Sequence, residues 1–512
     1  MGTTQLHPAL AGLEPRELWE RFDELRQIPR PSMLEEGVRR HLEAIAETQG
    51  WRSARDEAGN LFVYVPGRGV GKKAPPLAVQ GHMDMVCTKR AEVQHDFEKD
   101  PIQLKRGKIE IEGETREVLQ ADGTTLGSDN GIGVAAALAL ALDPGLDHPP
   151  LELIFTADEE VGMSGAEHLD SELVHAKRLL NFDAEEHGSF YLSCAGGRDL
   201  IARWAVEREE IAADDLPLFL SISGLAGGHS GVDIHRNRTN AILLMAQALS
   251  DQCIELDGIR LGRFDGGGQD NAIPRQSEVL LWCARHRAEP LAKSLTDLMA
   301  RLGREMDPTD HGAFCFEARI GDEAEREALA DFAPLSNRMF RTVLKMLCAF
   351  PNGVLVMSEA IEGLVESSSN LGILETTHDE MRLVSLTRSS KRGAVEAIQG
   401  RMELAMEAAG AQVEFSNAWP GWEADLDNPL VRTAISTYAE LFDQAPAIKA
   451  IHGGLECGYL AERLPSCNMI AFGPEIVNAH TPDEAVVLDT VGPFYELARR
   501  LLRNLCRSER GA

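Results

Sequence analysis

Short apolar runs that stop at acidic or histidine residues are the feature that most constrains what this chain can fold into. Apolar runs of four to six residues are typical of strands buried on both faces of a sheet. The runs and the polar residues that follow them are, in chain order, residues 77–81 before His82 and Asp84, residues 151–156 before Asp158, Glu159 and Glu160, residues 178–182 before Asp183, and residues 469–473 before His480. The pattern predicts buried strands whose ends carry chemically active side chains.

Helical patterns separate these runs. One is the Ala/Leu-rich segment from Ile132 to Leu142, and a second helix is expected over residues 165–174. Strands that alternate with helices favour a parallel or mixed α/β sheet. In such a sheet, ligands bind outside the carboxyl ends of the strands. We therefore expect the His, Asp and Glu residues that follow the strands to meet at one edge of the sheet.

The chain is long enough for more than one hydrophobic core, because domains usually contain about 100–200 residues. Its pattern changes after residue 196, and a Pro/Asp-rich linker spans residues 419–429 of the 512. The simplest interpretation is a two-domain α/β protein. A catalytic domain with a mixed or parallel sheet flanked by helices, formed by residues 1–196 and 425–512, would be interrupted by an inserted α/β domain of residues 197–424.

The charge composition excludes several classes of partner. The 51 Lys and Arg residues against 81 Asp and Glu residues give a formal net charge of −30. Such a surface repels nucleic acids and anionic lipids but attracts metal cations, so we expect neither a nucleic acid nor a membrane as partner. Nine cysteines occur without a CxxC pair, and the first 20 residues lack the apolar segment of a secretory signal. We expect reduced thiols and a cytoplasmic protein.

His82 and Asp84 lie two positions apart at the end of a predicted strand, so their side chains point to the same side. The carboxylate of Asp84 could accept the ring N–H of His82 and orient it as a metal ligand. Taken alone, the pair is also compatible with a structural histidine.

Asp129 lies between glycines at the start of the Ala/Leu-rich helix, where an aspartate can either cap the helix or bind a metal ion. Glu159 and Glu160 are adjacent carboxylates that repel each other unless a positive charge lies near them, although a solvated acidic loop is the alternative. Together with Asp183 and His480, these residues suit a pair of divalent cations such as Zn²⁺ or Mn²⁺.

Five segments that contain these residues resemble, in order, the metal-site motifs of the M20 family of metallopeptidases, and within it the aminoacyl-histidine (Xaa-His) dipeptidase branch, also called cytosolic non-specific dipeptidases. The segments are residues 80–86, 126–133, 157–162, 181–183 and 478–480. One departure is Ser128, where an alanine is expected before the acid. The resemblance implies that Asp129 bridges two metal ions, and it suggests a cis peptide bond between Asp129 and Asn130.

The resemblance assigns a role to each of the other residues at these motifs. His82 and Asp183 would complete the shell of the first metal ion, and Glu160 and His480 that of the second. Asp84 would orient His82, and Glu159 would be the general base.

The inserted domain resembles the lid of this family. In residues 227–231, His229 resembles the lid histidine that polarises the scissile carbonyl, and Asn271 and Arg388 resemble the groups that bind the substrate carboxylate. His452 and Glu456 resemble residues of a substrate-pocket loop. For all five residues the alternative is ordinary polar structure, and the sequence leaves open whether His229 acts in its own subunit or in the partner of a homodimer.

The function implied by the resemblance is a metal-dependent dipeptidase that hydrolyses Xaa-His and other dipeptides with a free C-terminal carboxylate. Two divalent ions, Zn²⁺ in the first place with Mn²⁺ or Co²⁺ as alternatives, would hold a bridging water. Two other hypotheses are an amidohydrolase of the same family that acts on N-acyl amino acids, and a non-catalytic homologue that binds small peptides. A general base at Glu159 argues against the second of these.

Overall fold

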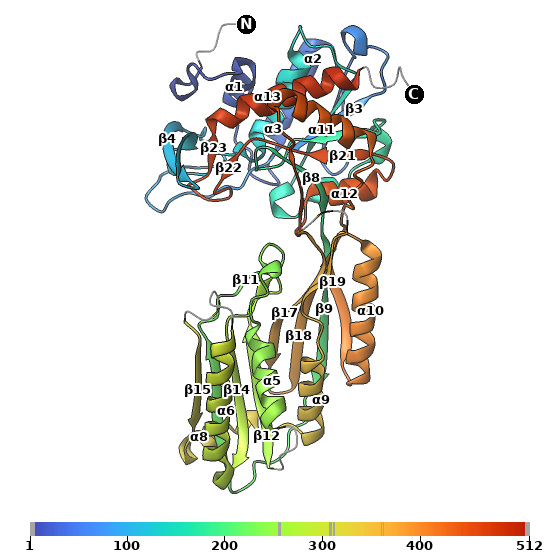
Figure 1. Ribbon diagram of the computed structural model, residues 1–512. Helices are drawn as coiled ribbons and strands as arrows, with labels where there is room; N and C mark the ends of the chain where they lie inside the picture. Colours follow the sequence, from blue (N-terminus) through green and yellow to red (C-terminus); the bar gives the residue numbers. More distant parts are fainter. Residues whose placement is uncertain are drawn as a thin grey trace. The chain divides into compact units, whose positions relative to one another are not determined.

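The computed structural model describes residues 6–253, 258–306, 310, 313–359, 361 and 363–506. The described chain divides into two compact units (Figure 1). Unit 1 contains residues up to 193 together with 422–450 and 455 onward, and unit 2 contains residues 194–421 and 451–454. The short return at 451–454 was not anticipated from the sequence, which assigned these residues to the first domain. It arises because Ala195 N donates to Ile451 O at 3.0 Å and His452 binds Ser368, both within unit 2.

Unit 1 is built on an eight-stranded mixed sheet. Its strands, in sheet order, are β1 (Arg52–Arg55), β2 (Leu61–Val65), β6 (Leu151–Thr156), β3 (Leu77–His82), β7 (Arg178–Asn181), β21 (Asn468–Ala471), β8 (Ser189–Cys194) and β20 (Ala447–Ile451). The four central strands β6, β3, β7 and β21 run parallel to one another, so their carboxyl ends share one edge. The apolar runs identified in the sequence form these four strands.

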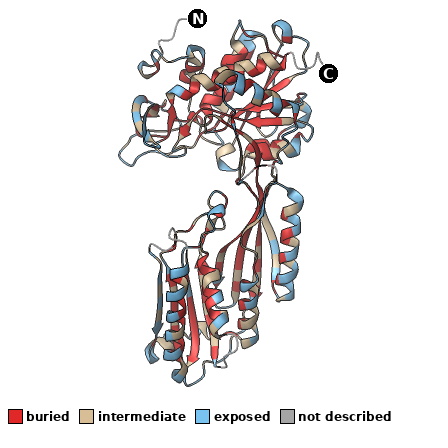
Figure 2. Ribbon diagram, viewed as in Figure 1, coloured by how far each residue is buried: buried red, intermediate tan, exposed pale blue. Residues whose placement is uncertain are grey.

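A second sheet in unit 1 has four strands. In sheet order they are β22 (Ile476–Val477), β23 (Ala485–Val487), β5 (Glu114–Ala121) and β4 (Leu104–Ile111). The helices of the unit are α1 (Arg16–Leu25), α2 (Glu36–Gln49), α3 (Ser128–Leu142), α4 (Ser164–Glu167), α11 (Pro429–Phe442), α12 (Glu456–Arg463) and α13 (Leu488–Leu505). Helix α3 contains the predicted Ala/Leu-rich segment and is buried along almost its whole length (Figure 2).

The helix expected over residues 165–174 is wrong in extent. Helix α4 ends at Glu167, and a separate 3₁₀ turn spans Ser171–Leu173. The turn begins because the Asp170 side chain accepts the N–H of Glu172 at 2.9 Å, which competes with continuation of the helix.

The core of unit 1 contains a cluster of phenylalanines that pack edge to face. Phe182 lies 5.2 Å from Phe472 and 5.3 Å from Phe494 between ring centroids, and Phe190 also packs against Phe472. All four rings are buried. Because Phe182 immediately precedes Asp183, this packing holds the backbone on which the Asp183 carboxylate is mounted.

Unit 2 contains a large antiparallel sheet covered by helices (Figure 1). Its strands, in sheet order, are β15 (Cys315–Ile320), β10 (Asp215–Ser223), β14 (Ser277–Ala284), β12 (Ile259–Gly267), β17 (Val365–Thr376), β18 (Glu380–Ser389), β9 (Gly196–Ala205) and β19 (Gln412–Trp419), and β16 (Gly353–Met357) pairs with β17. The helices are α5 (Ala241–Cys253), α6 (Arg285–Glu305), α8 (Glu323–Ala328), α9 (Asn337–Cys348) and α10 (Arg392–Ala408). A separate pair, β11 (Gly228–His229) and β13 (Ala272–Ile273), carries part of the predicted substrate site.

The predicted α/β architecture, a mixed sheet flanked by helices with an inserted domain, is confirmed. In the part of the chain that the structure describes, no helix combines the length and the apolar character needed to cross a membrane.

Candidate active site

The carboxyl edge of the central parallel strands brings together most of the predicted metal ligands. In the register of the sheet, His82 at the end of β3 lies opposite Thr156 at the end of β6, and Gln80 lies opposite Asn181 at the end of β7. The segments that follow β6 and β7 carry Glu159, Glu160 and Asp183 to this edge. The side chains meet because parallel strands end at the same side of a sheet.

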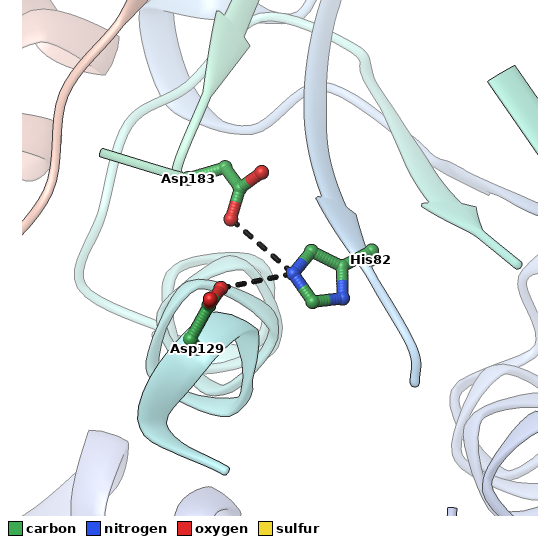
Figure 3. A group of neighbouring side chains, drawn as sticks. All are labelled: His82, Asp129 and Asp183. Atoms are coloured by element: carbon green, nitrogen blue, oxygen red, sulfur yellow. Dashed lines mark hydrogen bonds and ion pairs between the residues drawn. The ribbon is translucent and has the colours of Figure 1, made fainter. Parts of the chain in front are cut away.

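His82 forms the first of two clusters at this edge. Its Nε2 lies 2.9 Å from Asp129 Oδ1 and 3.4 Å from Asp183 Oδ1, and the side chain is buried (Figure 3). Burial disfavours the charged imidazolium, but the carboxylates of Asp183, Asp129 and Asp84 outweigh it and raise the pKa of His82 above its ordinary value. The position therefore strongly favours a positive charge.

His480 forms the second cluster. It follows β22, and its Nε2 lies 3.1 Å from Asp129 Oδ2 and 2.9 Å from Glu160 Oε2. Its hydrogen bonds with Asp129 and Glu160 raise the pKa of His480 to about 11. Asp129 thus presents one carboxylate oxygen to each histidine, and lies between two groups of nitrogen and oxygen donors.

The loop that carries Asp129 is held by Glu484, which the sequence analysis did not identify. The Glu484 carboxylate accepts the N–H groups of residues 126–129 at 2.7–3.3 Å and the hydroxyl of Ser128 at 2.6 Å. The serine that departs from the expected alanine thus adds one hydrogen bond to this anchor. The peptide bond between Asp129 and Asn130 is cis, as predicted.

Asp84 connects His82 to the segment that carries the two glutamates. Its Oδ1 lies 3.2 Å from His82 Nδ1, and its carboxylate accepts the N–H groups of Glu159 and Glu160 at 3.1 and 3.2 Å. Burial opposes the carboxylate, but His82 and the hydroxyl of Ser32 outweigh burial and lower the pKa of Asp84 to about 2. Asp84 is therefore a charged acceptor placed behind the histidine.

Arg30 is a second residue that the sequence analysis did not single out. Its buried guanidinium donates to the carbonyls of Met83, Asp84 and Gly127 at 3.0, 2.6 and 2.5 Å. Gly127 adopts a positive φ of 69° at the start of α3, which glycine allows at little cost. Arg30 thereby ties the end of β3 to the start of α3.

Glu159 lies close to two candidate metal ligands, His82 and Glu160. Ligand atoms of His82, Glu159 and Glu160 all lie within 4.8 Å of one another. Burial raises the pKa of Glu159 well above its ordinary value, with His82 opposing and the nearby carboxylates reinforcing the shift. A carboxylate in this environment is a good proton acceptor, which is the property that a general base needs.

Glu185 joins this edge without having been predicted. Ligand atoms of Asp129, Glu185 and His480 lie within 4.8 Å of one another. Burial, with the nearby Asp129 and Asp183, raises the pKa of Glu185 to about 8. The neighbouring Glu186 instead binds Lys449 Nζ and the hydroxyl of Tyr191.

Glu456 is placed beneath the strand ends of unit 1, at the start of α12. Its buried carboxylate accepts hydrogen bonds from Gln80 Nε2 at 2.6 Å and Thr156 Oγ1 at 2.9 Å. Gln80 in turn accepts from Asn181 Nδ2 at 2.6 Å. Burial raises the pKa of Glu456 to about 8. The contacts make Glu456 part of a buried network that joins β3, β6 and β7.

His229 and Asn271 lie on neighbouring segments of unit 2. His229 on β11 pairs with Ala272 on β13, next to Asn271, whose carbonyl accepts the N–H of Ser230 at 2.8 Å. His229 Nδ1 accepts the N–H groups of Gly231 and Val232, both at 3.1 Å. The ring proton of the neutral imidazole is therefore on Nε2, where the exposed side chain can donate it. Burial and the charge of Arg388 lower the pKa of His229, which favours this neutral form.

Arg388 on β18 is a buried cation in unit 2. Its side chain lies 5.1 Å above the ring of Trp419, and the residue is 5% exposed. Within the described residues, its Nε has no hydrogen-bond partner and no carboxylate forms an ion pair with it. Burial lowers the pKa of Arg388 to about 10, with Asp199 and Asp270 opposing. A charged guanidinium with unused donors is suited to bind an anionic ligand.

His452 lies beside Arg388 in unit 2. Its Nε2 forms a 2.7 Å hydrogen bond with Ser368 Oγ, and Ser368 faces Arg388 across the β17–β18 ladder. Burial and the charge of Arg388 lower the pKa of His452 to about 3, so the ring is neutral. The four predicted residues of the inserted domain and its return, His229, Asn271, Arg388 and His452, thus belong to unit 2, whereas Glu456 belongs to unit 1.

The donor set at the edge of unit 1 fits two divalent cations. It combines imidazole nitrogens with carboxylate oxygens. Ligand atoms of His82, Asp129 and Asp183 lie within 4.8 Å of one another, and His480 Nε2 lies 3.1 Å from Asp129 Oδ2 and 2.9 Å from Glu160 Oε2. Within the described residues, Glu160 Oε1 is buried without a hydrogen-bond partner. Nitrogen and oxygen donors of this kind suit Zn²⁺ and Mn²⁺.

Three residues at this site, Arg30, Glu484 and Glu185, were not found from the sequence. Arg30 lies in a Pro-Arg-Pro segment, residues 29–31, that precedes the first motif, and Glu484 lies four residues after His480. Neither position follows an apolar run, so the strand-end pattern does not point to them. Glu185 does follow a predicted strand, but nothing in the local sequence distinguishes it from Glu186.

Comparisons with known proteins gave matches along most of the chain. A model of peptidase family M20/M25/M40 matches residues 78–504. The chain is 34% identical to the cytosol non-specific dipeptidase of Escherichia coli over 496 residues, which cover 97% of this chain and 99% of that protein. The crystal structure of an aminoacylhistidine dipeptidase from Vibrio alginolyticus matches with a TM-score of 0.89 and 36% identity, covering 97% of this chain and 98% of that one. The aminopeptidase PepT of Bacillus cereus, with a TM-score of 0.53, 15% identity and coverage of 97% and 100%, shares the fold. The chain belongs to peptidase family M20/M25/M40.

Proposed function

We propose that this chain is a metal-dependent dipeptidase. Its substrates would be dipeptides with a free C-terminal carboxylate, Xaa-His dipeptides among them. The observation that carries the proposal is the position of Asp129, whose two carboxylate oxygens face His82 and His480 separately. The names of the relatives from E. coli and V. alginolyticus support the choice of a dipeptide substrate. The name of the E. coli relative also supports a location in the cytosol.

In this proposal two divalent cations, Zn²⁺ with Mn²⁺ or Co²⁺ as alternatives, are held by residues of unit 1. His82, Asp129 and Asp183 would hold one ion, and Asp129, Glu160 and His480 the other. When bound, such a pair of ions lowers the pKa of a water molecule and polarises the scissile carbonyl. Asp84 orients His82, and Glu484 orients the loop of Asp129 through hydrogen bonds that do not require the ions.

The remaining steps fall to side chains of this chain. Glu159 would take the proton of the attacking water and pass it to the leaving amine, a role that its raised pKa supports. His229 would donate its Nε2 proton to the developing oxyanion, in agreement with the tautomer that its Nδ1 contacts select. Arg388, with Asn271, would bind the C-terminal carboxylate. His452 and Glu456 would shape the substrate pocket.

The test is a metal titration joined to a substrate assay. The purified chain should bind two ions, and it should hydrolyse alanyl-alanine and β-alanyl-histidine much faster than N-acetyl-alanine. Asp129→Asn should weaken binding of both ions, whereas His480→Ala should weaken binding of one. Asp122→Asn, at an exposed acid in the same region, is the matched control. Failure of the metal-loaded chain to hydrolyse any dipeptide in a broad screen would refute the proposal, and faster hydrolysis of N-acetyl-alanine would make it an amidohydrolase instead.

A further inference from the structure

Glu185 is a carboxylate at the active edge of unit 1 for which the proposed mechanism has no use. It lies in the segment that follows β7, two residues after Asp183. Its carboxylate, a carboxylate oxygen of Asp129 and a ring nitrogen of His480 lie within 4.8 Å of one another. The residue as a whole is exposed, while its carboxylate is partly desolvated by its neighbours at this edge, so a small molecule there can reach it.

The backbone around Glu185 is held in place. The N–H of Ile476 donates to the Glu185 carbonyl at 2.8 Å, and the N–H of His187 donates to Glu475 Oε2 at 2.8 Å. These bonds tie the segment to the strand that precedes His480. The backbone that carries Glu185 is therefore fixed to the segment that leads to the second histidine.

Glu185 is an additional carboxylate beyond those needed to balance the charge of two divalent cations. Asp84, Glu456 and Glu484 are engaged in hydrogen bonds within unit 1. The other carboxylates that the proposed mechanism uses are those of Asp129, Glu159, Glu160 and Asp183, which can carry four negative charges. Two divalent cations carry four positive charges. Glu185 adds one more carboxylate beside the centre, and a cation that lies next to a carboxylate in a crowded acidic site stabilises its charged form.

A dipeptide carries a cation, its α-ammonium group, close to the peptide bond that is hydrolysed. The α-ammonium nitrogen is separated from the scissile carbonyl carbon by only two bonds, which is a distance of about 2.5 Å. Any group that recognises the ammonium must therefore lie next to the centre that attacks the carbonyl. An N-acyl amino acid has no ammonium at this position, so a carboxylate there gives it no favourable contact.

We propose that Glu185 binds the free α-ammonium group of the substrate, and that it thereby makes the enzyme select dipeptides over N-acylated amino acids. The inference rests on the proposed peptidase function and names a specificity residue for it. The observation that supports this inference is the position of Glu185 next to Asp129 and His480.

The experiment compares two substrates that differ only in the ammonium group. Alanyl-alanine carries it, and propionyl-alanine has a hydrogen in its place. The kcat and KM of both are measured for the wild-type chain and for Glu185→Gln, Glu185→Asp and Glu186→Gln, with propionyl-alanine used as a competitive inhibitor where it is not turned over. Bound metal is counted for each variant by elemental analysis.

Glu185→Gln should lower kcat/KM for alanyl-alanine about 10- to 100-fold, mainly through KM, which is the range for loss of a hydrogen bond to a charged group. The constants for propionyl-alanine should change less than about twofold, since no charged contact is lost. Glu185→Asp should recover part of the loss because it keeps the charge. Glu186→Gln should behave like the wild type towards both compounds, because Glu186 is occupied by Lys449 and Tyr191.

Four outcomes would overturn the inference. If Glu185→Gln slowed both compounds equally, the residue would not recognise the ammonium. If that variant bound one metal ion fewer than the wild type, Glu185 would be a metal ligand. If the wild-type chain hydrolysed no dipeptide, the proposed function would fail and this inference with it. A wild-type chain that hydrolyses alanyl-alanine while Glu185→Gln leaves the ratio unchanged would refute the role of Glu185 alone.

Discussion

The two units of this protein differ in the charge of the groups at their candidate binding sites: carboxylates in unit 1 and a guanidinium in unit 2. At the edge of unit 1, the carboxylates of Asp129, Asp183 and Glu160 surround two histidines whose pKa values are raised. In unit 2, the buried Arg388 lies among histidines whose pKa values are lowered. The carboxylates of unit 1 favour binding of cations, and Arg388 in unit 2 favours binding of an anion. Under the proposed function, unit 1 would bind the metal ions and unit 2 would recognise the substrate carboxylate.

Removal of metal should have the largest effect of all, because in the proposed function unit 1 needs cations for catalysis. Treatment with EDTA followed by dialysis should abolish dipeptide hydrolysis, and Zn²⁺, Mn²⁺ or Co²⁺ should restore it. Elemental analysis and the rate of alanyl-alanine hydrolysis measure the effect. Full activity in a sample with less than about one ion per ten chains would contradict a metal-dependent mechanism.

Glu159→Gln should be the most damaging single substitution that spares the metal. We expect a loss of about 10²–10⁴ in kcat, the usual contribution of a general base, with the bound metal unchanged. Single-turnover hydrolysis and elemental analysis separate the two quantities. Glu57→Gln, at an exposed glutamate of unit 1, is the control. A kcat near that of the wild type would remove Glu159 from the proton transfer.

Arg388→Ala probes the anion site of unit 2. The KM for alanyl-alanine should rise about 10- to 100-fold, as expected for loss of a charged hydrogen bond. Arg388→Lys should recover only part of the binding, because an ammonium lacks the planar fork of the guanidinium. The control is Arg382→Ala, since Arg382 lies on the same strand but contacts Glu375. An unchanged KM for Arg388→Ala would place the carboxylate site elsewhere.

Glu484→Gln tests whether the loop of Asp129 is positioned by its anchor. The amide nitrogen of glutamine would face backbone N–H groups whose hydrogen bonds the carboxylate now accepts. The loop of Asp129 would be held less firmly, and metal binding should weaken about 10-fold. The free energy of unfolding should fall by about 1–3 kcal/mol. Isothermal titration with Zn²⁺ and thermal unfolding measure the two effects. Asp483→Asn, at the exposed neighbour, should leave metal affinity unchanged.

His452 gives the smallest effect, and it depends on pH. Its pKa is lowered to about 3 in the folded chain, chiefly by burial, so the unfolded chain takes up a proton that the folded chain does not as the pH falls below about 6.5. The contribution of His452 to stability is therefore complete above that pH and is lost towards pH 3. When the pH falls from 7 to 5, the free energy of unfolding should decrease in both proteins. The decrease should be smaller in His452→Gln than in the wild type, by up to about 2 kcal/mol. Equal losses in both proteins would show that His452 is not held neutral.

Local sequence was sufficient to predict the elements that carry the chemistry. The apolar runs before His82, Glu159 and Asp183 specify buried parallel strands, and the polar residues that follow such strands necessarily share an edge. The helix over residues 165–174 was predicted wrongly, because Asp170 offers its side chain to a nearby N–H and ends the regular pattern.

The anchors of the site could not be predicted in this way. Glu484 binds residues 126–129 across more than 350 positions of the chain, and Arg30 binds Gly127 across 97. Contacts over such separations leave no periodic signal in one sequence. Glu185 and Glu186 are identical in type and adjacent, and only the neighbours that the fold supplies distinguish them.

The central strands, the Ala/Leu-rich helix, the acidic character and the identity of the donor atoms could be read from the amino-acid sequence, because they follow from side-chain chemistry and from spacing along the chain. Tertiary structure decided which oxygen of Asp129 faces which histidine, which ring nitrogen of His229 keeps its proton, and that Arg388 is buried without a carboxylate in contact among the described residues. These properties depend on direction and burial, and both arise only when distant segments pack together.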